Sequence, residues 1–289
     1  MLGVAWGLTW PAMRIALYEV HPFGLRWVAE ALGASTLFVL AGFGRRLVIP
    51  KGIMRFHIVI AGLFNVSGFT ILASFAQIGT ATSRVVILAY TMPIWASVLA
   101  VPILDERLNT ARVAGLALCA TGVAVLTYPL ASTTIPVSIL LALAAAMCWA
   151  IGTVYLKWVR MEADPLAVAA WQLVVGFVSA SLLLPFFEDI PAVWHLRPET
   201  LLSLVFTGVI GAGFAYFVWF TIVGRVSAIT AALGALSVPV IGIASSMAIL
   251  GERPSVPDVV GSVLVIAAAA CALLQPNDRV GIQTAEPKV

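Results

Sequence analysis

The stretch ILDERLNTARVAG, residues 103–115, returns later in the chain as ILGERPSVPDVVG, residues 249–261. Each copy follows a long apolar run that contains a proline. Glu106 lies 13 residues after Pro93, and Glu252 lies 13 residues after Pro239. The return of proline, Glu-Arg turn and glycine at matched spacing indicates that the chain contains an internal duplication.

The composition is that of a protein surrounded by lipid. Of the 289 residues, 62% are hydrophobic and 10% are charged, and the mean hydropathy is +1.07. A soluble domain is about a quarter charged, so this chain has too few charged side chains to cover a globule in water. The net charge of +3 is too small to predict a nucleic-acid surface. We expect membrane lipid as a partner and no nucleic acid.

Ten apolar segments are long enough to cross a bilayer, which takes about 20 apolar residues in a helix. Turn and charge signals such as RRLVIPKG, RMEADP and GERPSVPD separate them. We therefore predict an all-α membrane protein with ten transmembrane helices. Their expected ranges are 2–18, 23–43, 58–77, 84–104, 110–128, 135–158, 165–187, 200–221, 227–250 and 258–274.

The basic residues predict the orientation. With ten spans, both termini share one side of the membrane, and that side carries eleven of the 16 Lys and Arg residues. The other five are Arg14, Arg26, Arg84, Arg197 and Arg253. Because cytoplasmic loops are enriched in Lys and Arg, we expect a multi-pass protein of the bacterial inner membrane with both termini in the cytoplasm.

The duplication extends over almost the whole chain. At an offset of 143 residues Trp6 matches Trp149, and at an offset of 146 Pro93 matches Pro239. We predict two five-helix repeats, residues 1–128 and 135–274, followed by a polar tail, 275–289. Since five is odd, the second repeat enters the membrane upside down. Inverted repeats are typical of transporters that work by alternating access, although duplication is also a simple way to build a bundle.

The two Glu-Arg turns, LDERL and LGERP, with their matched prolines and glycines, resemble the EamA repeat of the drug/metabolite transporter superfamily. Within that family the sequence looks most like the YddG-type bacterial amino-acid exporters. The resemblance implies ten helices and cytoplasmic termini. It also implies a cavity lined mainly by the first, third, fourth, sixth, eighth and ninth helices. The implied function is efflux of amino acids and related small metabolites.

The turn residues are expected to be structural. Glu106 and Glu252 precede the fifth and tenth helices, where a carboxylate can accept hydrogen bonds from free N–H groups at a helix start. Arg107 and Arg253 can pair locally or reach lipid headgroups. Small residues such as Gly115, Gly122 and Gly261 allow close helix packing.

The matched prolines stand in the middle of the fourth and ninth segments. Proline removes one backbone hydrogen bond and bends a helix. Pro93 and Pro239 are therefore candidate hinges, and static kinks are the alternative.

A polar stripe marks the expected substrate site. Ser67, Thr70, Ser74 and Gln77 are spaced 3, 4 and 3 residues apart, so they share one helix face. Such a face is poorly suited to lipid and can line a cavity or contact another helix. Its equivalents in the eighth segment include Tyr216, so aromatic rings would face the polar groups. The full predicted substrate site consists of Trp6, Ser67, Thr70, Ser74, Gln77, Tyr90, Trp95, Trp149, Tyr216 and Trp219.

Few charges fall within the apolar segments. Glu30 follows Arg26 by one helical turn, which suits either an ion pair near the outer interface or a protonatable coupling group. The spacing of His, Cys, Asp and Glu matches no metal-site, hydrolase or phosphate-binding motif, so we expect no metal, no cofactor and no enzymatic activity. A scaffold protein is the other class considered.

We predict an exporter of amino acids and related metabolites that functions as a monomer. Exporters of sugars, purines or cationic drugs are the alternative.

Overall fold

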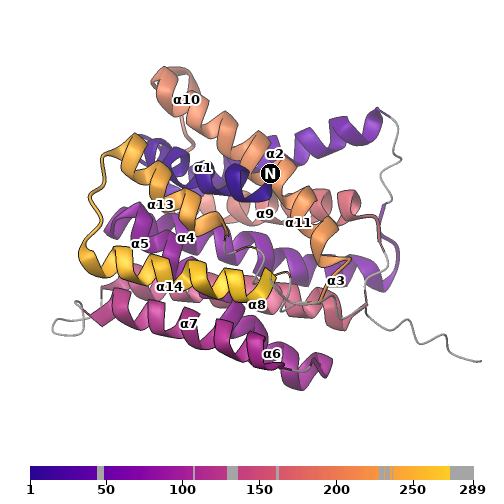
Figure 1. Cartoon of the computed structure of the whole chain (residues 1–289). Helices are drawn as coiled ribbons and strands as arrows, with labels where there is room; N and C mark the ends of the chain where they lie inside the picture. The colour runs from indigo at the N-terminus through magenta and orange to yellow at the C-terminus, as the bar shows by residue number, and fades with distance from the viewer. Residues whose placement is uncertain are drawn as a thin grey trace, which may run out of the picture.

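The computed structural model describes residues 1–43, 49–106, 108–128, 136–160, 163–227, 231, 235 and 237–273. Within these ranges the regular secondary structure is entirely helical. The helices lie side by side as one bundle (Figure 1). Arg107 and the tail at 275–289 lie outside the described residues.

The first repeat supplies seven α-helices and one π-helical turn. Their bounds are α1 (Leu2–Ala16), α2 (Pro22–Gly42), α3 (Ile53–Gly62), η1 (Leu63–Gly68), α4 (Phe69–Gly79), α5 (Thr82–Ala89), α6 (Met92–Leu104) and α7 (Thr110–Thr127). The third predicted span is thus the continuous rod α3–η1–α4, and the fourth is divided into α5 and α6.

The second repeat follows the same order. Its described elements are α8 (Val137–Trp158), α9 (Pro165–Phe187), η3 (Val193–His195), α10 (Pro198–Val205), η4 (Phe206–Phe214), α11 (Ala215–Val223), α13 (Ser237–Leu250) and α14 (Val256–Leu273). The π-helical turns η1 and η4 fall at equivalent places, because residues 63–68 shifted by 146 are residues 209–214.

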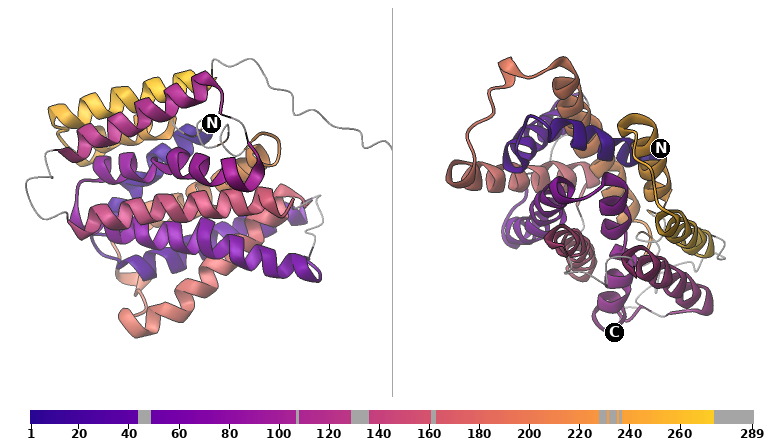
Figure 2. Two further views of the ribbon diagram at one scale, coloured as in Figure 1. Left: turned by 90° about the horizontal axis from the view of Figure 1, so that it is seen from below. Right: turned by 90° about the vertical axis from the view of Figure 1, so that its left-hand side faces the viewer.

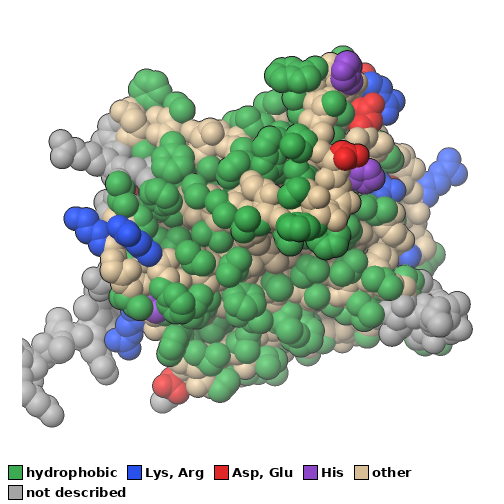
Figure 3. Space-filling view, turned by 180° about the vertical axis from the view of Figure 1, so that it is seen from behind, with side chains coloured by type: hydrophobic (Ala, Val, Ile, Leu, Met, Phe, Trp, Pro, Cys, Tyr) green, Lys and Arg blue, Asp and Glu red, His purple; other side chains and the backbone are tan. Residues whose placement is uncertain are grey.

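Six helical rods in the described ranges are long and apolar enough to cross a membrane. They are Pro22–Gly42, Ile53–Gly79, Thr82–Leu104, Val137–Trp158, Pro165–Phe187 and Pro198–Val223. The molecular surface fits this finding, because hydrophobic side chains cover its middle while charged side chains gather near two opposite ends (Figure 3). Large hydrophobic side chains exposed on the surface include Leu182, Phe186 and Val263.

The main helix pairings join one half of the chain to the other. Helix α1 packs on α13, α2 lies against α9 and η4, α4 and α6 pack on α8, and α7 packs on α14. Figures 1 and 2 show α7 and α14 side by side at one edge of the bundle. The two repeats are therefore interleaved, and the centre of the bundle is an interface between them.

Glycine permits the close approach of α7 and α14. A Cβ atom on Gly122 would lie 2.9 Å from the backbone oxygen of Gly261, which is closer than real Cβ atoms come to such an atom. A Cβ on Gly115 would lie 3.3 Å from the oxygen of Ala268. Small residues thus let the two backbones touch, as is usual for helices that pack in lipid.

Pro93 stands in the first turn of α6, directly after the break that ends α5 at Ala89. Proline is tolerated there because the first N–H groups of a helix have no partner within that helix. The fourth span, Thr82–Leu104, is accordingly interrupted by a turn at Tyr90 and Thr91, between α5 and α6. Pro239 occupies the equivalent place in the first turn of α13.

Two carboxylates cap helices at one end of the bundle. Glu252 accepts hydrogen bonds from the backbone N of Thr82 at 2.7 Å and of Ser83 at 2.9 Å, at the start of α5. Glu188 accepts in the same way from Phe23 and Gly24 at the start of α2. The Glu252 carboxylate therefore caps α5, rather than α14, the helix that follows it in sequence.

The two Glu-Arg turns lie at opposite ends of the α5–α6 rod. Glu252 contacts its first residues, whereas Glu106 follows Leu104, its last residue. We call the end that carries Glu252 the Glu252 face and the opposite end the Glu106 face. Arg84 and Asp258 approach to 3.6 Å on the Glu252 face. Arg253 is exposed there.

Candidate functional site

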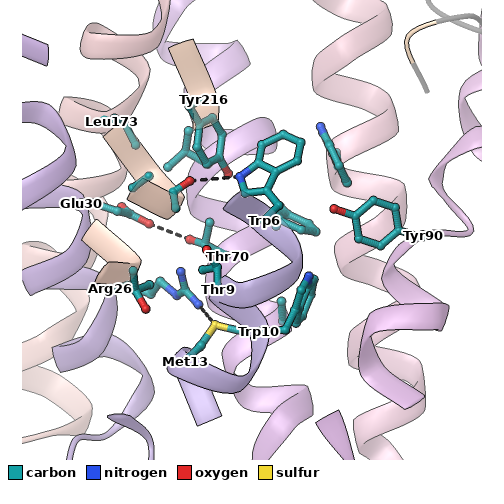
Figure 4. A pocket seen from close by; sticks show the side chains of 17 residues that line it. Trp6, Thr9, Trp10, Met13, Arg26, Glu30, Thr70, Tyr90, Leu173 and Tyr216 are labelled. Carbon is teal, nitrogen blue, oxygen red and sulfur yellow. Dashed lines mark hydrogen bonds between the residues drawn. The ribbon is translucent and has the colours of Figure 1, made fainter. Parts of the chain in front are cut away.

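A cavity of about 50 Å³ lies at the centre of the bundle, where the two repeats meet (Figure 4). This volume accommodates a few water molecules and is small beside typical ligand pockets of roughly 300–1,000 Å³. The conformation is thus one with a nearly filled centre. The cavity is lined by Trp6, Thr9, Trp10, Met13, Arg26, Glu30, Val66, Phe69, Thr70, Ala73, Tyr90, Trp149, Leu173, Thr207, Gly211, Ala212 and Tyr216.

Half of the predicted substrate-site residues line this cavity, namely Trp6, Thr70, Tyr90, Trp149 and Tyr216. They come from α1, α4, the break after α5, α8 and α11. Segments that are distant in the chain therefore converge on one point. The remaining five predicted residues, Ser67, Ser74, Gln77, Trp95 and Trp219, are not among the lining residues.

Three of these five belong to the polar stripe and bond to neighbouring helices. Ser67 donates to Ser179 Oγ at 3.0 Å, on α9. The amide nitrogen of Gln77 donates to the carbonyl oxygen of Trp10 at 3.3 Å. Ser74 accepts from Arg26 Nε at 2.6 Å. The stripe is therefore buried as predicted, but it divides between the cavity wall and the contacts between helices.

The two tryptophans outside the cavity occupy different surroundings. Trp219 is buried, and its ring centroid lies 5.1 Å from that of Trp149 and 5.6 Å from that of Trp6. Trp95 is partly buried and donates to Thr91 Oγ1 at 3.2 Å. Trp219 thus supports the cavity wall from behind, and Trp95 braces the start of α6.

An aromatic cluster fills most of the centre. The indole rings of Trp6 and Trp149, which are repeat equivalents, meet edge to face with centroids 5.3 Å apart. Tyr90 lies 5.5 Å from Trp149, and Tyr216 lies 5.7 Å from Trp6. Edge-to-face contacts of this kind are favourable because the positive ring edge meets the negative ring face. The cavity is small because these rings pack against each other.

The π-helical turns supply hydrogen-bond acceptors to this cluster. Gly211 in η4 accepts from the indole nitrogen of Trp6 at 3.0 Å, and Asn65 in η1 accepts from the hydroxyl of Tyr216 at 3.1 Å. Both acceptors are backbone oxygens. Short π-helical segments are rare and frequently occur at functional sites, and here both lie beside the cavity.

Arg26 and Glu30 also line the cavity, and both are almost fully buried, with 6% and 1% of their surfaces exposed. The Glu30 carboxylate accepts from Thr70 Oγ1 at 2.6 Å, whereas Arg26 contacts Ser74 and the Met13 sulfur. Among the described residues no carboxylate oxygen comes within 4 Å of the Arg26 guanidinium. The structure therefore places these charges in the core, without the interfacial ion pair considered from sequence.

Thr9, Met13 and Thr207 line the cavity but are absent from the predicted site. Thr9 and Met13 follow Trp6 by three and seven residues, so they share its helix face. That spacing could have identified Thr9 and Met13 as cavity residues from the sequence. Thr207 is a single polar residue within an apolar run, and its place in the wall depends on the π-helical turn η4.

Two cations occupy equivalent positions at opposite ends of the bundle. Arg14, near the end of α1, donates to the carbonyl oxygen of Gln77 at the end of α4. Its repeat equivalent, Lys157 near the end of α8, donates to the carbonyl oxygen of Val226 after α11. Each cation thus binds a C-terminal carbonyl, where a helix carries partial negative charge. The Arg14 contact lies at the Glu252 face and the Lys157 contact lies at the Glu106 face.

The Glu106 face is hollowed beside Lys157. A pocket of about 310 Å³ lies between α8, α9 and α11, and another of about 290 Å³ lies between the ends of α6 and α8. Lys157 and Arg160 line both pockets, and Asp105 and Glu106 line the second one. This face is therefore more open than the centre and carries charges of both signs.

Comparisons with known proteins agree with this architecture. The EamA-like transporter family matches residues 1–128 and 136–274, which is most of the chain. A solved crystal structure superimposes with a TM-score of 0.71 over 94% of this chain and 95% of the other, at 22% identity. That likeness concerns the fold.

Curated relatives are similar over nearly their whole length. An uncharacterized transporter of Bacillus subtilis, YoaV, is 26% identical over 92% of this chain and 93% of its own. A probable amino-acid metabolite efflux pump of Salmonella typhimurium is 28% identical over 91% and 89%. A probable terminal-alkyne amino-acid exporter of Streptantibioticus cattleyicolor is 24% identical over 91% of this chain and 88% of its own. The chain is a multi-pass membrane transporter and belongs to the EamA-like transporter family.

Proposed function

We propose that the protein exports amino acids and related small metabolites across the bacterial inner membrane. The observation that carries this proposal is the cavity between the two repeats, which combines aromatic walls with a few polar and charged groups. Aromatic rings suit varied side chains, and a small number of polar groups is typical of sites that orient a small ligand. Relatives named as amino-acid efflux pumps and exporters support the same class of cargo.

We further propose ten spans, four more than the six identified by length and hydropathy among the described residues. The additional spans are α1, α7, the segment ending in α13, and α14. With residues 1–128 and 135–274 as inverted repeats, the Glu106 face and both termini lie in the cytoplasm. Lys157 and Arg160 on that face agree with the positive-inside rule.

The transport cycle we propose is alternating access. The repeats would exchange two mirror-related shapes, and the cavity would open to one face at a time. The contacts of Arg14 and Lys157 are candidate latches. The first joins the end of α1 to the end of α4, and the second joins the end of α8 to the segment after α11. With both latches formed and a cavity of about 50 Å³, this conformation corresponds to an occluded state in the cycle. A monomer contains both halves of the site.

Transport by purified protein in liposomes tests this function. Vesicles loaded with an unlabelled amino acid should accumulate the labelled form by exchange, and protein-free vesicles should not. A panel of amino acids, sugars, purines and cationic drugs would separate the proposal from its alternatives. Exchange of sugars, purines or drugs without exchange of any amino acid would contradict it.

The proposed orientation of the two repeats in the membrane can be tested separately. Single cysteines placed beside Glu106 and beside Glu252 should react with an impermeant thiol reagent from opposite sides of intact cells, with the Glu252 side labelled from outside. Labelling of both positions from one side would contradict the inverted arrangement.

A further inference from the structure

Arg26 and Glu30 are two opposite charges on one face of α2, and both line the central cavity (Figure 4). Their hydrogen-bond partners are neutral. The guanidinium binds the Ser74 hydroxyl and the thioether of Met13, which is a weak acceptor. One carboxylate oxygen of Glu30 accepts from Thr70, and the other has no hydrogen-bond partner in the described part of the chain. Each charge therefore retains unused binding capacity.

Burying a charge without a counter-ion is costly, so such groups in membrane proteins are usually paired or functional. A structural ion pair would place the two groups in contact, yet no nitrogen of Arg26 lies within 4 Å of a Glu30 oxygen. Each group is held at its own place by a different neighbour on α4, Ser74 for Arg26 and Thr70 for Glu30. The arrangement keeps the two side chains out of hydrogen-bond contact, although their charges still attract each other.

The second repeat carries neither charge. At the offset of 143 residues, Arg26 corresponds to Ala169 and Glu30 corresponds to Leu173. Leu173 lines the same cavity from α9, the helix that packs against α2. The second repeat therefore forms the same five-helix scaffold without a charged pair at these positions. The fold does not require the pair, so we associate it with the cavity.

We propose that Arg26 and Glu30 bind the two charges of a zwitterionic α-amino acid. The guanidinium would take the carboxylate, for which its planar donors are suited, and the Glu30 carboxylate would take the ammonium group. Residues one helical turn apart have Cβ atoms about 5–6 Å from each other, so both side chains can reach groups carried on one carbon atom. This assignment rests on the proposed function and specifies its substrate class.

The cargo's own side chain then faces the aromatic cluster. Trp6 and Tyr216 form the wall beside α2, and Trp149 lies beyond Trp6. These rings must separate for the cavity to admit an amino acid, because the present volume is about 50 Å³. The charged pair would define the class of cargo, and the rings would accept side chains of varied shape.

Compounds that lack one charge should bind poorly. An amine without the carboxylate would leave Arg26 unpaired, and an acid without the ammonium would leave Glu30 unpaired. Hydrogen bonds to charged groups contribute about 1.5–3 kcal/mol, which corresponds to roughly tenfold or more in affinity. We therefore expect each one-charge analogue to bind about tenfold or more weakly than the amino acid.

The experiment compares three compounds with one side chain: phenylalanine, phenethylamine and 3-phenylpropionate, with the leucine set as a second series. Binding is measured by ligand-induced thermal stabilisation of the purified protein, and by inhibition of amino-acid exchange in liposomes. Wild-type protein should prefer the zwitterion. Equal binding of the amine or of the acid by wild-type protein would overturn the proposal, and this comparison needs no variant to fold.

Substitutions then assign each charge. Glu30→Gln should weaken amino-acid binding about tenfold or more and bring the acid close to the amino acid in affinity. Arg26→Gln should do the same for the amine. The exposed residues Glu199 and Arg253 provide matched controls, and E199Q and R253Q should retain wild-type preference. Unchanged preference in both cavity variants would overturn the assignment.

The experiments distinguish failure of the Arg26 and Glu30 assignment from failure of the proposed function. Amino-acid exchange by wild-type protein with no preference for zwitterions over one-charge analogues would contradict the role of Arg26 and Glu30 alone. Absence of exchange or binding for every amino acid tested would contradict the proposed function, and the zwitterion site with it.

Discussion

The backbone oxygens of Asn65 and Gly211, repeat equivalents 146 residues apart, each accept a hydrogen bond from an aromatic side chain at the centre of the bundle. The donors are not equivalent. Gly211 receives the indole N–H of Trp6, whereas Asn65 receives the hydroxyl of Tyr216. The indole nitrogen of Trp149, which symmetry would place on Asn65, is buried and without a hydrogen-bond partner among the described residues. The two repeats therefore differ in their hydrogen bonds at the centre of the bundle, although the residues concerned are repeat equivalents.

That asymmetry predicts unequal effects of two similar substitutions. Trp6→Phe removes the donor to the Gly211 carbonyl oxygen, and loss of such a hydrogen bond costs about 0.5–1.5 kcal/mol of unfolding free energy in addition to the lost ring volume. Trp149→Phe removes the same volume but breaks no hydrogen bond in this state. Thermal unfolding in detergent should rank W6F below W149F, while both reduce exchange. Equal stabilities would contradict the asymmetry.

Glu252 should contribute to stability rather than to substrate choice. Glu252→Ala removes the cap from two N–H groups of α5, and loss of a helix cap costs about 0.5–2 kcal/mol. Glu252→Gln, which keeps one acceptor oxygen, should cost less. Unfolding temperature and folded yield measure the effect, with the exposed Arg253→Ala as a near-neutral control. Altered substrate preference at normal yield would argue against a structural role.

The glycines of α7 provide a graded test of helix packing. Gly122→Ala should destabilise the protein, because the new methyl group would lie 2.9 Å from the backbone oxygen of Gly261 and backbone cannot move aside as a side chain can. Gly115→Ala, at 3.3 Å from a backbone oxygen, should be milder. Unfolding temperatures should therefore fall in the order wild type, G115A, G122A. The reverse order would contradict the packing of α7 on α14.

The proposed latches predict opposite changes in access. Lys157→Met should favour opening at the Glu106 face, and Arg14→Met should favour opening at the Glu252 face. A cysteine at the cavity residue Thr207, in a background without the three native cysteines, should then react faster with an impermeant reagent applied from the corresponding side. Unchanged labelling rates in both variants would exclude a latch role.

Glu19 predicts a pH dependence outside the membrane. The hydrogen bond from Thr200, followed by those from Arg197, holds the pKa of the Glu19 carboxyl below its ordinary value. A lowered pKa in the folded state stabilises the protein above the ordinary carboxyl pKa, and this contribution is lost as the pH falls through the lowered value. Wild type should unfold at a higher temperature than E19Q at pH 7, and the difference should shrink on acidification.

Hydropathy and repetition were sufficient to predict the helical architecture. A helix that crosses a membrane needs about 20 consecutive apolar residues, and such a run is recognisable in the sequence without knowledge of distant contacts. The break beside Pro93 was harder to place. Proline indicates that a helix cannot continue undisturbed, but the sequence does not say where the interruption falls or what packs against it. Here Tyr90, in the turn before α6, contacts Trp10 and Trp149.

The site was predictable only in part, for a related reason. Periodicity placed Ser67, Thr70 and Ser74 on a buried face, but it cannot say whether a buried polar group meets a cavity or another helix. That distinction depends on what stands opposite, and Ser179 opposite Ser67 is 112 residues away. The same limit applies to Glu252, whose hydrogen-bond partners on α5 lie 170 and 169 residues away in the sequence.

Arg26 and Glu30 stand where the second repeat has Ala169 and Leu173, and this difference has a consequence for the orientation of the cargo. Two identical subunits related by a twofold axis would present every charge twice, and a bound molecule could lie in either of two reversed poses. A single covalent chain can keep the charge in one half only. Its cargo would then bind in one pose only, with its charged groups and its side chain always facing the same halves of the protein. Each molecule would therefore cross the membrane in one fixed orientation.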